Sequence, residues 1–342
     1  RALAGGSTHY TANQGSASLR AKLAAYEAKT RQLDYGPDEI LVTAGATEAI
    51  YCALTGVLDP GDEVVIPTPA FGLYETVTRL AGAVPVYLDT ARTGFQLTYE
   101  AVCAAITPQT KALVLNSPNN PTGAVYTENS LAAVCRAVGD RPIFILCDDV
   151  YRGLCTRPCP DPAALPGLRE RLLIAQSFSK PWAMTGWRIG YTAGPLEVIK
   201  AMSSLQSQVA SGSNSIAQYA AEEALRSPKG PEEIERMHKA YDERRRHIVA
   251  RLNAIDGLKC VMPKGAFYVM VDMSALIGKH LGDRQIGGSM DFADMLLENA
   301  NVALTPGTAF CAEGYCRISY ATSMEHIDKG VDRIEHFVNS LV

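Results

Sequence analysis

A lysine near the middle of the chain stands among residues that could bind a phosphorylated carbonyl compound. Lys180 follows the apolar run Leu172–Phe178, with Ser177 and Ser179 just before it and Arg188 eight residues later. At the carboxyl edge of a strand, such a lysine faces the usual ligand crevice of an open α/β sheet. There it could form a Schiff base if its surroundings lower its pKa. A lone lysine is usually a solvated surface residue, but serine hydroxyls and an arginine are natural phosphate partners and favour the chemical interpretation.

Polar side chains also follow two other apolar runs. Asn116, Asn119 and Asn120 stand at the end of one run, and their amides can both donate to and accept from an aromatic hydroxyl or a carboxylate. Asp148 and Tyr151 follow the next run, where a buried carboxylate is costly unless it meets a cation such as a protonated pyridine nitrogen. The structural alternatives are an ordinary turn for the asparagines and a helix N-cap for the aspartate.

A fourth segment, Thr43–Ile50, has the pattern of a strand, a turn of small residues and a helix. Backbone N–H groups at such a helix start can bind phosphate. Small residues are common at strand–helix turns, so this segment is informative only together with the other three.

The apolar runs that carry these residues alternate with helical patterns, which is the order of an α/β domain with a doubly wound parallel sheet. Several runs are apolar on both faces, as expected for strands covered by helices on both sides. The predicted strands are Ile40–Thr43, Glu63–Pro67, Val84–Leu88, Ala112–Asn116, Ile143–Asp148, Leu172–Phe178 and Ile189–Ala193, and the predicted helices between them are Ala46–Val57, Phe71–Ala81 and Glu128–Val138.

The pattern changes in the last third of the chain. Leu196–Leu225 and Pro231–Ala254 each read as one long helix. After Gly257, short strands and two helices predict a smaller α+β domain. We expect the N-terminal helix Ala17–Thr30 to pack near this domain or across the domain junction. The short strands are Leu258–Met262, Ala266–Asp272, Val302–Thr305 and Cys316–Ala321, and the helices are Asp291–Ala300 and Met324–Leu341.

Composition narrows the function classes. The 342 residues are 47% hydrophobic, which excludes disorder as the main state. The 32 basic and 36 acidic residues leave a net charge of −4 rather than the basic surplus of a nucleic-acid-binding protein. No apolar run reaches the roughly 18 residues of a membrane span. Nine cysteines without a disulfide-like or zinc-like spacing predict reduced thiols, a cytoplasmic location and no metal site.

Together the four segments closely resemble the pyridoxal-phosphate-dependent aminotransferases of fold type I, class I/II. The most specific matches are Ser-x-Ser-Lys before Gly186-Trp187-Arg188-Ile189-Gly190, and Asn-Asn-Pro-Thr-Gly starting at Asn119. The resemblance runs from Tyr10 to Tyr320. It implies a mainly parallel seven-stranded sheet in a large domain, residues 31–240, and a small domain, residues 241–342. Residues 1–30 would lie near the small domain and a dimer interface.

The resemblance also implies a role for each motif residue. Lys180 would carry the cofactor as a Schiff base and shuttle the substrate proton, with Asp148 and Tyr151 completing the catalytic set. Arg317 would grip the substrate α-carboxylate together with Asn120. The full set of cofactor-binding residues would be Ala46, Thr47, Phe71, Asn120, Asp148, Tyr151, Ser177, Ser179, Lys180, Arg188 and Tyr10, the last reaching the phosphate of a neighbouring subunit.

The resemblance implies an amino acid and a 2-oxo acid as substrates of a homodimer with shared sites, without a nucleic-acid or membrane partner. Thr47 stands where aspartate-specific relatives often have a lysine, which weakens aspartate as the expected substrate. The arm that covers the substrate pocket in the family is expected to be missing before Arg1. Stretch Ser211–Leu225 is similar to the subgroup with broad-specificity and N-acetyl-diaminopimelate aminotransferases.

Two other functions use much the same residues. Another fold type I enzyme, such as a β-C–S lyase or a 1-aminocyclopropane-carboxylate synthase, would need the same cofactor site. A regulator's aminotransferase-like sensor domain would carry an N-terminal DNA-binding region, and the lysine, aspartate and arginine favour catalysis instead.

Overall fold

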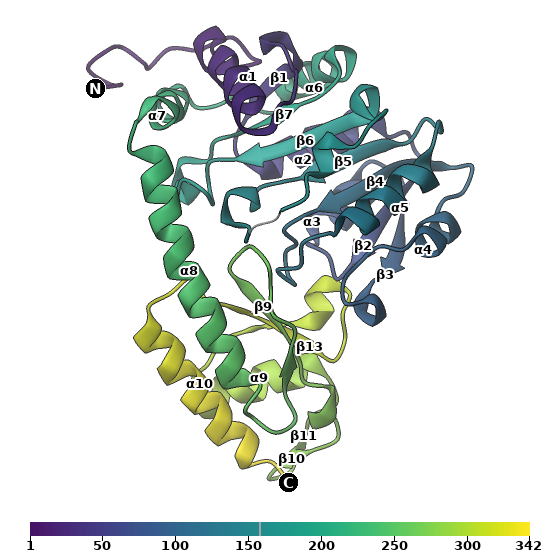
Figure 1. Cartoon of the computed structure of the whole chain (residues 1–342), viewed down its shortest axis with the longest axis vertical. Helices are drawn as coiled ribbons and strands as arrows, with labels where there is room; N and C mark the ends of the chain where they lie inside the picture. The colour runs from purple at the N-terminus through teal and green to yellow at the C-terminus, as the bar shows by residue number, and fades with distance from the viewer. Residues whose placement is uncertain (157–158) are drawn as a thin grey trace.

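The larger of two main sheets holds most of the predicted site residues. The computed structural model describes residues 1–156 and 159–342. The large sheet has seven strands in the order β1-β7-β6-β5-β4-β2-β3 (Figure 1). All neighbouring pairs are parallel except those of β7, which runs antiparallel to both β1 and β6. The strands are β1 Ile40–Thr43, β2 Glu63–Thr68, β3 Val84–Asp89, β4 Thr110–Asn116, β5 Phe144–Asp148, β6 Leu172–Ser177 and β7 Gly190–Ala193.

Helices cover both faces of this sheet, which explains why its strands are apolar on both sides. Leu113 and Leu115 of β4 belong to one hydrophobic core, whereas Val114 between them belongs to the core on the opposite face. The mainly parallel fold predicted from the sequence is confirmed. The helices of this part are α1 Ala17–Arg31, α2 Ala46–Val57, α3 Leu73–Leu80, α4 Tyr99–Ala105, α5 Glu128–Val138, α6 Leu196–Val209 and α7 Ser215–Arg226.

The prediction of a single long helix over Leu196–Leu225 is wrong, because the helix is interrupted between α6 and α7. Ser211 and Gly212 both have positive φ, at 54° and 102°, which is incompatible with a continuing right-handed helix. Asn214 then caps α7, since its side chain accepts a hydrogen bond from the Ala217 N–H.

A smaller four-stranded antiparallel sheet, in the order β12-β13-β9-β8, lies beyond α8. Figure 1 shows α8 running from the large sheet to the small one, where α10 lies beside it. The small sheet and its helices enclose a hydrophobic core of their own, which includes Val269, Phe292 and Ile334. The elements are α8 Gly230–Leu252, β8 Lys259–Cys260, β9 Tyr268–Asp272, β10 His280–Leu281, β11 Arg284–Gln285, α9 Ser289–Ala300, β12 Thr305–Pro306, β13 Tyr315–Ser319 and α10 Met324–Asn339.

The N-terminal helix α1 packs on the large sheet. Leu19 and Leu23 are fully buried in the same core as Ile40 of β1, and α1 lies against α7. This packing differs from the expectation that the first thirty residues lie near the small domain. The apolar face of α1 is therefore used to cover one side of the large sheet.

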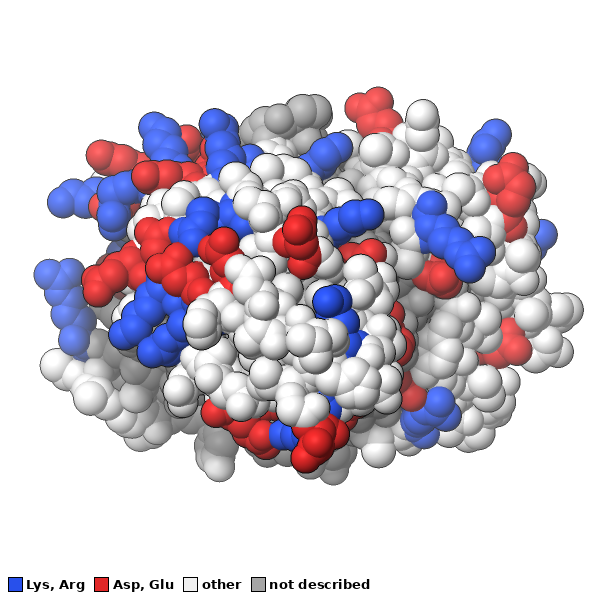
Figure 2. Space-filling view, turned by 90° about the horizontal axis from the view of Figure 1, so that it is seen from below, with Lys and Arg blue, Asp and Glu red and all other residues white. Residues whose placement is uncertain are grey.

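The surface carries both signs of charge. Figure 2 shows Lys and Arg side chains interspersed with Asp and Glu over the face at the small-domain end. None of the helices in the described part of the chain combines the length and apolar character needed to cross a membrane.

Candidate active site

Three strands of the large sheet end side by side at the candidate site. The register pairs Asn116, the last residue of β4, with Asp148, the last residue of β5. Ser177 ends the next strand, β6, and Lys180 follows it by three residues. Because these neighbouring strands are parallel, their polar carboxyl ends meet at one edge, where α/β sheets bind ligands.

Asp148 is a buried carboxylate with a defined orientation. Its Oδ2 accepts a hydrogen bond from the Tyr74 hydroxyl at 2.6 Å, and its Oδ1 accepts one from the Val150 N–H at 3.3 Å. The Asn116 amide donates to the Asp148 backbone carbonyl at 2.9 Å. Burial raises the pKa of Asp148 to about 6, against the opposing effects of Tyr74, Val150 and the positive charge of Lys180.

Lys180 lies among aromatic rings and charged groups. Its Nζ is 5.6 Å from the centroid of the Phe267 ring and 5.8 Å from that of Tyr151. Burial lowers the pKa of Lys180, and the positive charges of Arg188 and Arg317 lower it further, whereas Asp148 raises it. A larger share of the lysine is therefore the neutral amine, which is the form that attacks a carbonyl or accepts a proton.

Hydroxyls, a guanidinium and a helix start form an anion cradle beside Lys180. The Ser177 hydroxyl donates to Ser179 Oγ at 2.7 Å, and both serines are buried. Arg188 lies over the start of α2, because its Nη2 donates to the Ala44 carbonyl at 3.3 Å. Gly45 has a φ of 80°, and a Cβ on it would lie 2.7 Å from the same Nη2. Glycine is needed here for both conformation and space.

The start of α2 supplies the other side of this cradle. Ala46 and Thr47 are the first two residues of the helix, with Gly45 as its N-cap, so their backbone N–H groups lack partners within the helix. Such groups favour a negative ligand.

Arg317 of β13 reaches from the small sheet to the large one. Its Nη1 donates to Asn120 Oδ1 at 2.8 Å, and its Nη2 donates to Thr305 Oγ1 at 3.3 Å. The guanidinium carbon lies 4.4 Å from the Tyr268 ring centroid and 4.8 Å from that of Phe310. Two rings and two polar partners thus orient the guanidinium fork, which suits two-point binding of a carboxylate.

The structure brings together most of the residues predicted for the site. The Tyr151 hydroxyl lies 2.9 Å from that of Tyr268, and burial raises the pKa of Tyr151. Phe71 is half-buried and packs edge-on against Tyr74, with 6.0 Å between ring centroids. Tyr10 is 93% exposed in the single chain, and the role of reaching a neighbouring subunit's phosphate stays a prediction.

Two further residues of the site, Tyr74 and Tyr268, were not singled out from the sequence. Tyr268 lies in the predicted strand Ala266–Asp272, where it was given no role. Asn116, noted in the sequence only as a polar strand-end residue, donates to the Asp148 carbonyl and accepts from the backbone N–H of Asn120, the latter at 2.7 Å. Tyr74 follows Phe71 by three residues in the predicted helix Phe71–Ala81, and residues three apart lie on one helix face. That spacing is the signal that could have identified Tyr74.

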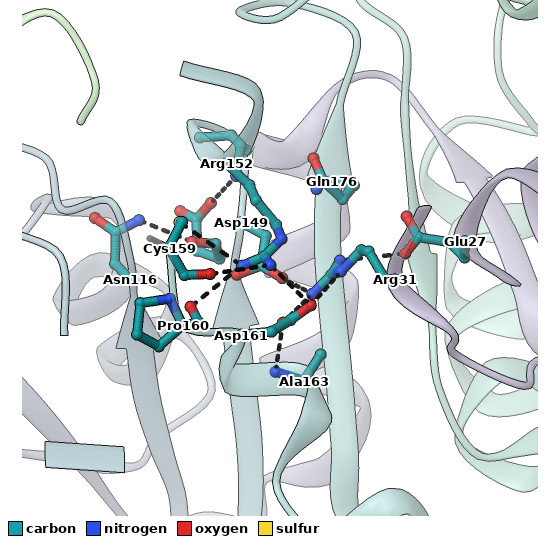
Figure 3. Close-up of polar contacts among 12 residues, drawn as sticks. Glu27, Arg31, Asn116, Asp149, Arg152, Cys159, Pro160, Asp161, Ala163 and Gln176 are labelled. Carbon is teal, nitrogen blue, oxygen red and sulfur yellow. Dashed lines mark hydrogen bonds and ion pairs between the residues drawn. The ribbon is translucent and has the colours of Figure 1, made fainter. Parts of the chain in front are cut away.

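A buried ion network includes Asp149, the residue after Asp148 (Figure 3). Arg31 of α1, whose side chain is 4% exposed, binds Asp149 Oδ2 at 2.5 Å and both carboxylate oxygens of Asp161. It also pairs with Glu27 at 3.2 Å, and Arg152 pairs with Asp161 at 3.1 Å. The network joins α1 to the loop after β5, and therefore fixes the segment that carries Asp148 and Tyr151.

The prediction that all cysteines are reduced is wrong for one pair. Cys155 and Cys159 form a disulfide, while the other seven cysteines are free. A spacing of four residues gave no disulfide signal in the sequence. Cys155 also forms an isolated antiparallel β-bridge with Gly265, and the Thr156 N–H donates to the Lys264 carbonyl at 2.8 Å.

The family profile described as "Aminotransferase class I and II" matches residues 1–334. The chain belongs to this family. An aspartate/prephenate aminotransferase of Cereibacter sphaeroides is 42% identical, over 100% of this chain and 86% of the relative. An aspartate aminotransferase of Geobacillus stearothermophilus is 39% identical, over 99% of this chain and 86% of the relative.

Solved structures agree with this assignment. The aspartate aminotransferase of Rhizobium meliloti has a TM-score of 0.95 at 39% identity, and covers 100% of this chain and 86% of its own. The aromatic aminotransferase of Pyrococcus horikoshii has a TM-score of 0.92 at 37% identity, with 99% and 90% covered. The aminotransferase therefore uses pyridoxal 5′-phosphate to move amino groups between amino acids and 2-oxo acids.

The residues present fit this cofactor. Asp148 is a buried carboxylate without an ion-pair partner among the described residues, as a site for a protonated ring nitrogen requires. The cradle of Arg188, Ser177 and the α2 start suits a phosphate, and both Arg188 and Asp148 act on the pKa of the half-buried Lys180.

Replacing Arg31 with Ala tests the ion network. The change leaves Asp149 and Asp161 without their main cation, so we expect the free energy of unfolding to fall by about 3–5 kcal/mol. Lys200→Ala is the control, because Lys200 and its partner Glu197 are both exposed and this pair contributes at most about 1 kcal/mol. Urea denaturation of the holoenzyme measures both, and equal losses would contradict the assignment.

The raised pKa of Asp148 predicts that this residue lowers the free energy of unfolding of the cofactor-free protein at higher pH. Because the pKa rises from 3.8 to about 6 on folding, Asp148 favours folding below pH 4, and this contribution is lost as the pH rises through 6. Asp148→Asn, which cannot ionise, should therefore unfold less readily than the parent above pH 6, by up to about 3 kcal/mol, with no gain near pH 4. Urea denaturation of the cofactor-free proteins at several pH values measures this difference. A variant of lower stability at pH 8 would contradict the prediction.

Proposed function

We propose that transamination takes place at one site formed by Lys180, Asp148 and Arg317. The observation that carries the proposal is the shared edge of β5 and β6, where the buried Asp148 and the half-buried Lys180 follow neighbouring parallel strands. Asp148, Arg188 and Arg317 all act on the pKa of Lys180. When bound, the cofactor supplies an aldehyde that takes up the amino group and a ring that withdraws electrons.

The chain's own residues would then have distinct tasks. Arg188, Ser177, Ser179 and the N–H groups of Ala46 and Thr47 would hold the phosphate, while Asp148 would keep a proton on the ring nitrogen. Tyr151 and Asn120 would bind the phenolic oxygen, and Phe71 would cover one face of the ring.

Substrate orientation and proton transfer would fall to Arg317 and Lys180. Arg317 would fix the donor's α-carboxylate in the orientation that its contacts with Asn120 and the two rings impose. The neutral Lys180 amine would remove the Cα proton and return it on the cofactor side.

Because the similar proteins include aspartate/prephenate and aspartate aminotransferases, aspartate is the first donor and prephenate the first acceptor to test. A second candidate is an aromatic donor, and one observation favours it. Thr47 stands where aspartate-specific relatives often have a lysine. Thr47 lies exposed at the start of α2, and the rings of Tyr268 and Phe310 flank Arg317.

We also propose a homodimer with shared sites and a cytoplasmic location. Tyr10 and Trp187 are exposed, at 93% and 48%, and Trp187 adjoins the phosphate cradle, so a second copy could cover both. Seven free cysteines support the location, although the Cys155–Cys159 disulfide does not. The proposed domain boundary near residue 240 falls within α8, the helix that links the two sheets.

A donor panel with 2-oxoglutarate or prephenate as acceptor tests the proposed function. We expect turnover and the absorption band of lysine-bound cofactor in the parent enzyme, and loss of both in Lys180→Ala. We also expect kcat/KM for phenylalanine to equal or exceed that for aspartate. A normal absorption band of lysine-bound cofactor in Lys180→Ala would contradict the role of Lys180. A kcat/KM for aspartate tenfold above that for phenylalanine would contradict the aromatic candidate.

A further inference from the structure

Tyr74 is a buried residue whose hydroxyl has one hydrogen-bond partner in the described part of the chain, the carboxylate of Asp148. The tyrosine is 1% exposed, and its hydroxyl donates to Asp148 Oδ2 at 2.6 Å. The other oxygen of Asp148 accepts from the Val150 N–H. Each carboxylate oxygen is therefore held by one donor from the chain, and its remaining lone pairs are available to a cationic ligand.

The start of α3 positions Tyr74 for this contact. The Thr78 hydroxyl donates to the Tyr74 carbonyl at 2.7 Å one turn later, which anchors the helix locally. Three residues before Tyr74, Phe71 packs its ring perpendicular to that of Tyr74, with 6.0 Å between centroids. The segment that enters α3 and its first turn thus supply both the residue proposed for the ring face and a partner for the residue proposed for the ring nitrogen.

A hydroxyl in this position can do more than fill space. A neutral donor bound to a carboxylate favours its charged form, and in a site closed to water this effect is stronger than at the surface. The direction of the hydrogen bond also limits rotation of the Asp148 side chain, whose backbone is fixed by Asn116 on the neighbouring strand. Orientation and charge of the carboxylate therefore both depend on Tyr74.

We propose that Tyr74 is a positioning residue of the aminotransferase, whose hydroxyl keeps the Asp148 carboxylate aligned and anionic for the ring nitrogen of the cofactor. The inference deepens the proposed function, because it rests on the role proposed there for Asp148. Tyr74 touches neither substrate nor reacting atoms, so it acts through Asp148 alone.

A double-mutant cycle separates this role from a purely structural one. Tyr74→Phe is made in the parent enzyme and in Asp148→Asn, and kcat, the KM of the amino donor and the dissociation constant of pyridoxal phosphate are measured in each. Tyr35→Phe is the matched control. Tyr35 is also a buried tyrosine, at 5% exposure, and its hydroxyl has no hydrogen-bond partner among the described residues.

In the parent enzyme we expect Tyr74→Phe to lower kcat about tenfold and to weaken cofactor binding about tenfold, the scale of one lost hydrogen bond to a charged group. The KM of the donor should change less than about twofold, because Arg317 is untouched. In Asp148→Asn the same change should have less than about a twofold effect on kcat. Tyr35→Phe should leave all three quantities as in the parent.

The outcomes distinguish this inference from the function on which it rests. If Asp148→Asn keeps full turnover, the proposed role of Asp148 fails, and the inference fails with it. If Asp148→Asn loses turnover but Tyr74→Phe lowers kcat equally in both backgrounds, or in neither, only the role of Tyr74 is overturned. If Tyr74→Phe does not fold, fluorotyrosine at this position keeps the shape and strengthens the donor. It should then tighten cofactor binding in the parent but not in Asp148→Asn, and an equal effect in both would overturn the inference.

Discussion

The architecture of the site depends on one buried negative charge. Asp148 lies at the end of β5 with almost no exposed surface, where an isolated carboxylate would be strongly disfavoured. Three neighbours from the chain hold it in place: the Tyr74 hydroxyl, the Val150 N–H and the Asn116 amide. A cationic ring nitrogen would be a fourth partner. The cofactor would thus supply the positive charge that the buried carboxylate lacks.

The large sheet places the other groups around this charge. Parallel β4, β5 and β6 end at one edge, which brings the asparagine loop, Asp148 and the Lys180 segment together without long excursions of the chain. The antiparallel β7 begins at the same edge, beside the end of β6. Arg188, two residues before β7, therefore reaches the start of α2. Arg317 comes from the small sheet, so the proposed substrate site involves both sheets, whereas the proposed cofactor site is formed mainly by the large one.

Much of this could be predicted from the sequence, because strand-end residues follow directly from the apolar pattern. The predicted strands ending at Asn116, Asp148 and Phe178 match β4, β5 and β6 to within one residue at that end, and they identified the residues at the shared edge. The rest depends on contacts between distant segments. The pairing of Tyr74 with Asp148 spans 74 residues, and that of Arg317 with Asn120 spans 197, so no local pattern marks either contact. The break at Gly212 was missed because both flanking segments have good helical patterns.

The most direct test of this account is the protonation of the ring nitrogen in the bound cofactor, measured by nitrogen NMR with ring-labelled pyridoxal phosphate. The account predicts a protonated nitrogen in the parent enzyme at neutral pH and an unprotonated one in Asp148→Asn. The same protonation state in both proteins would contradict the claim that the buried carboxylate pairs with the cofactor.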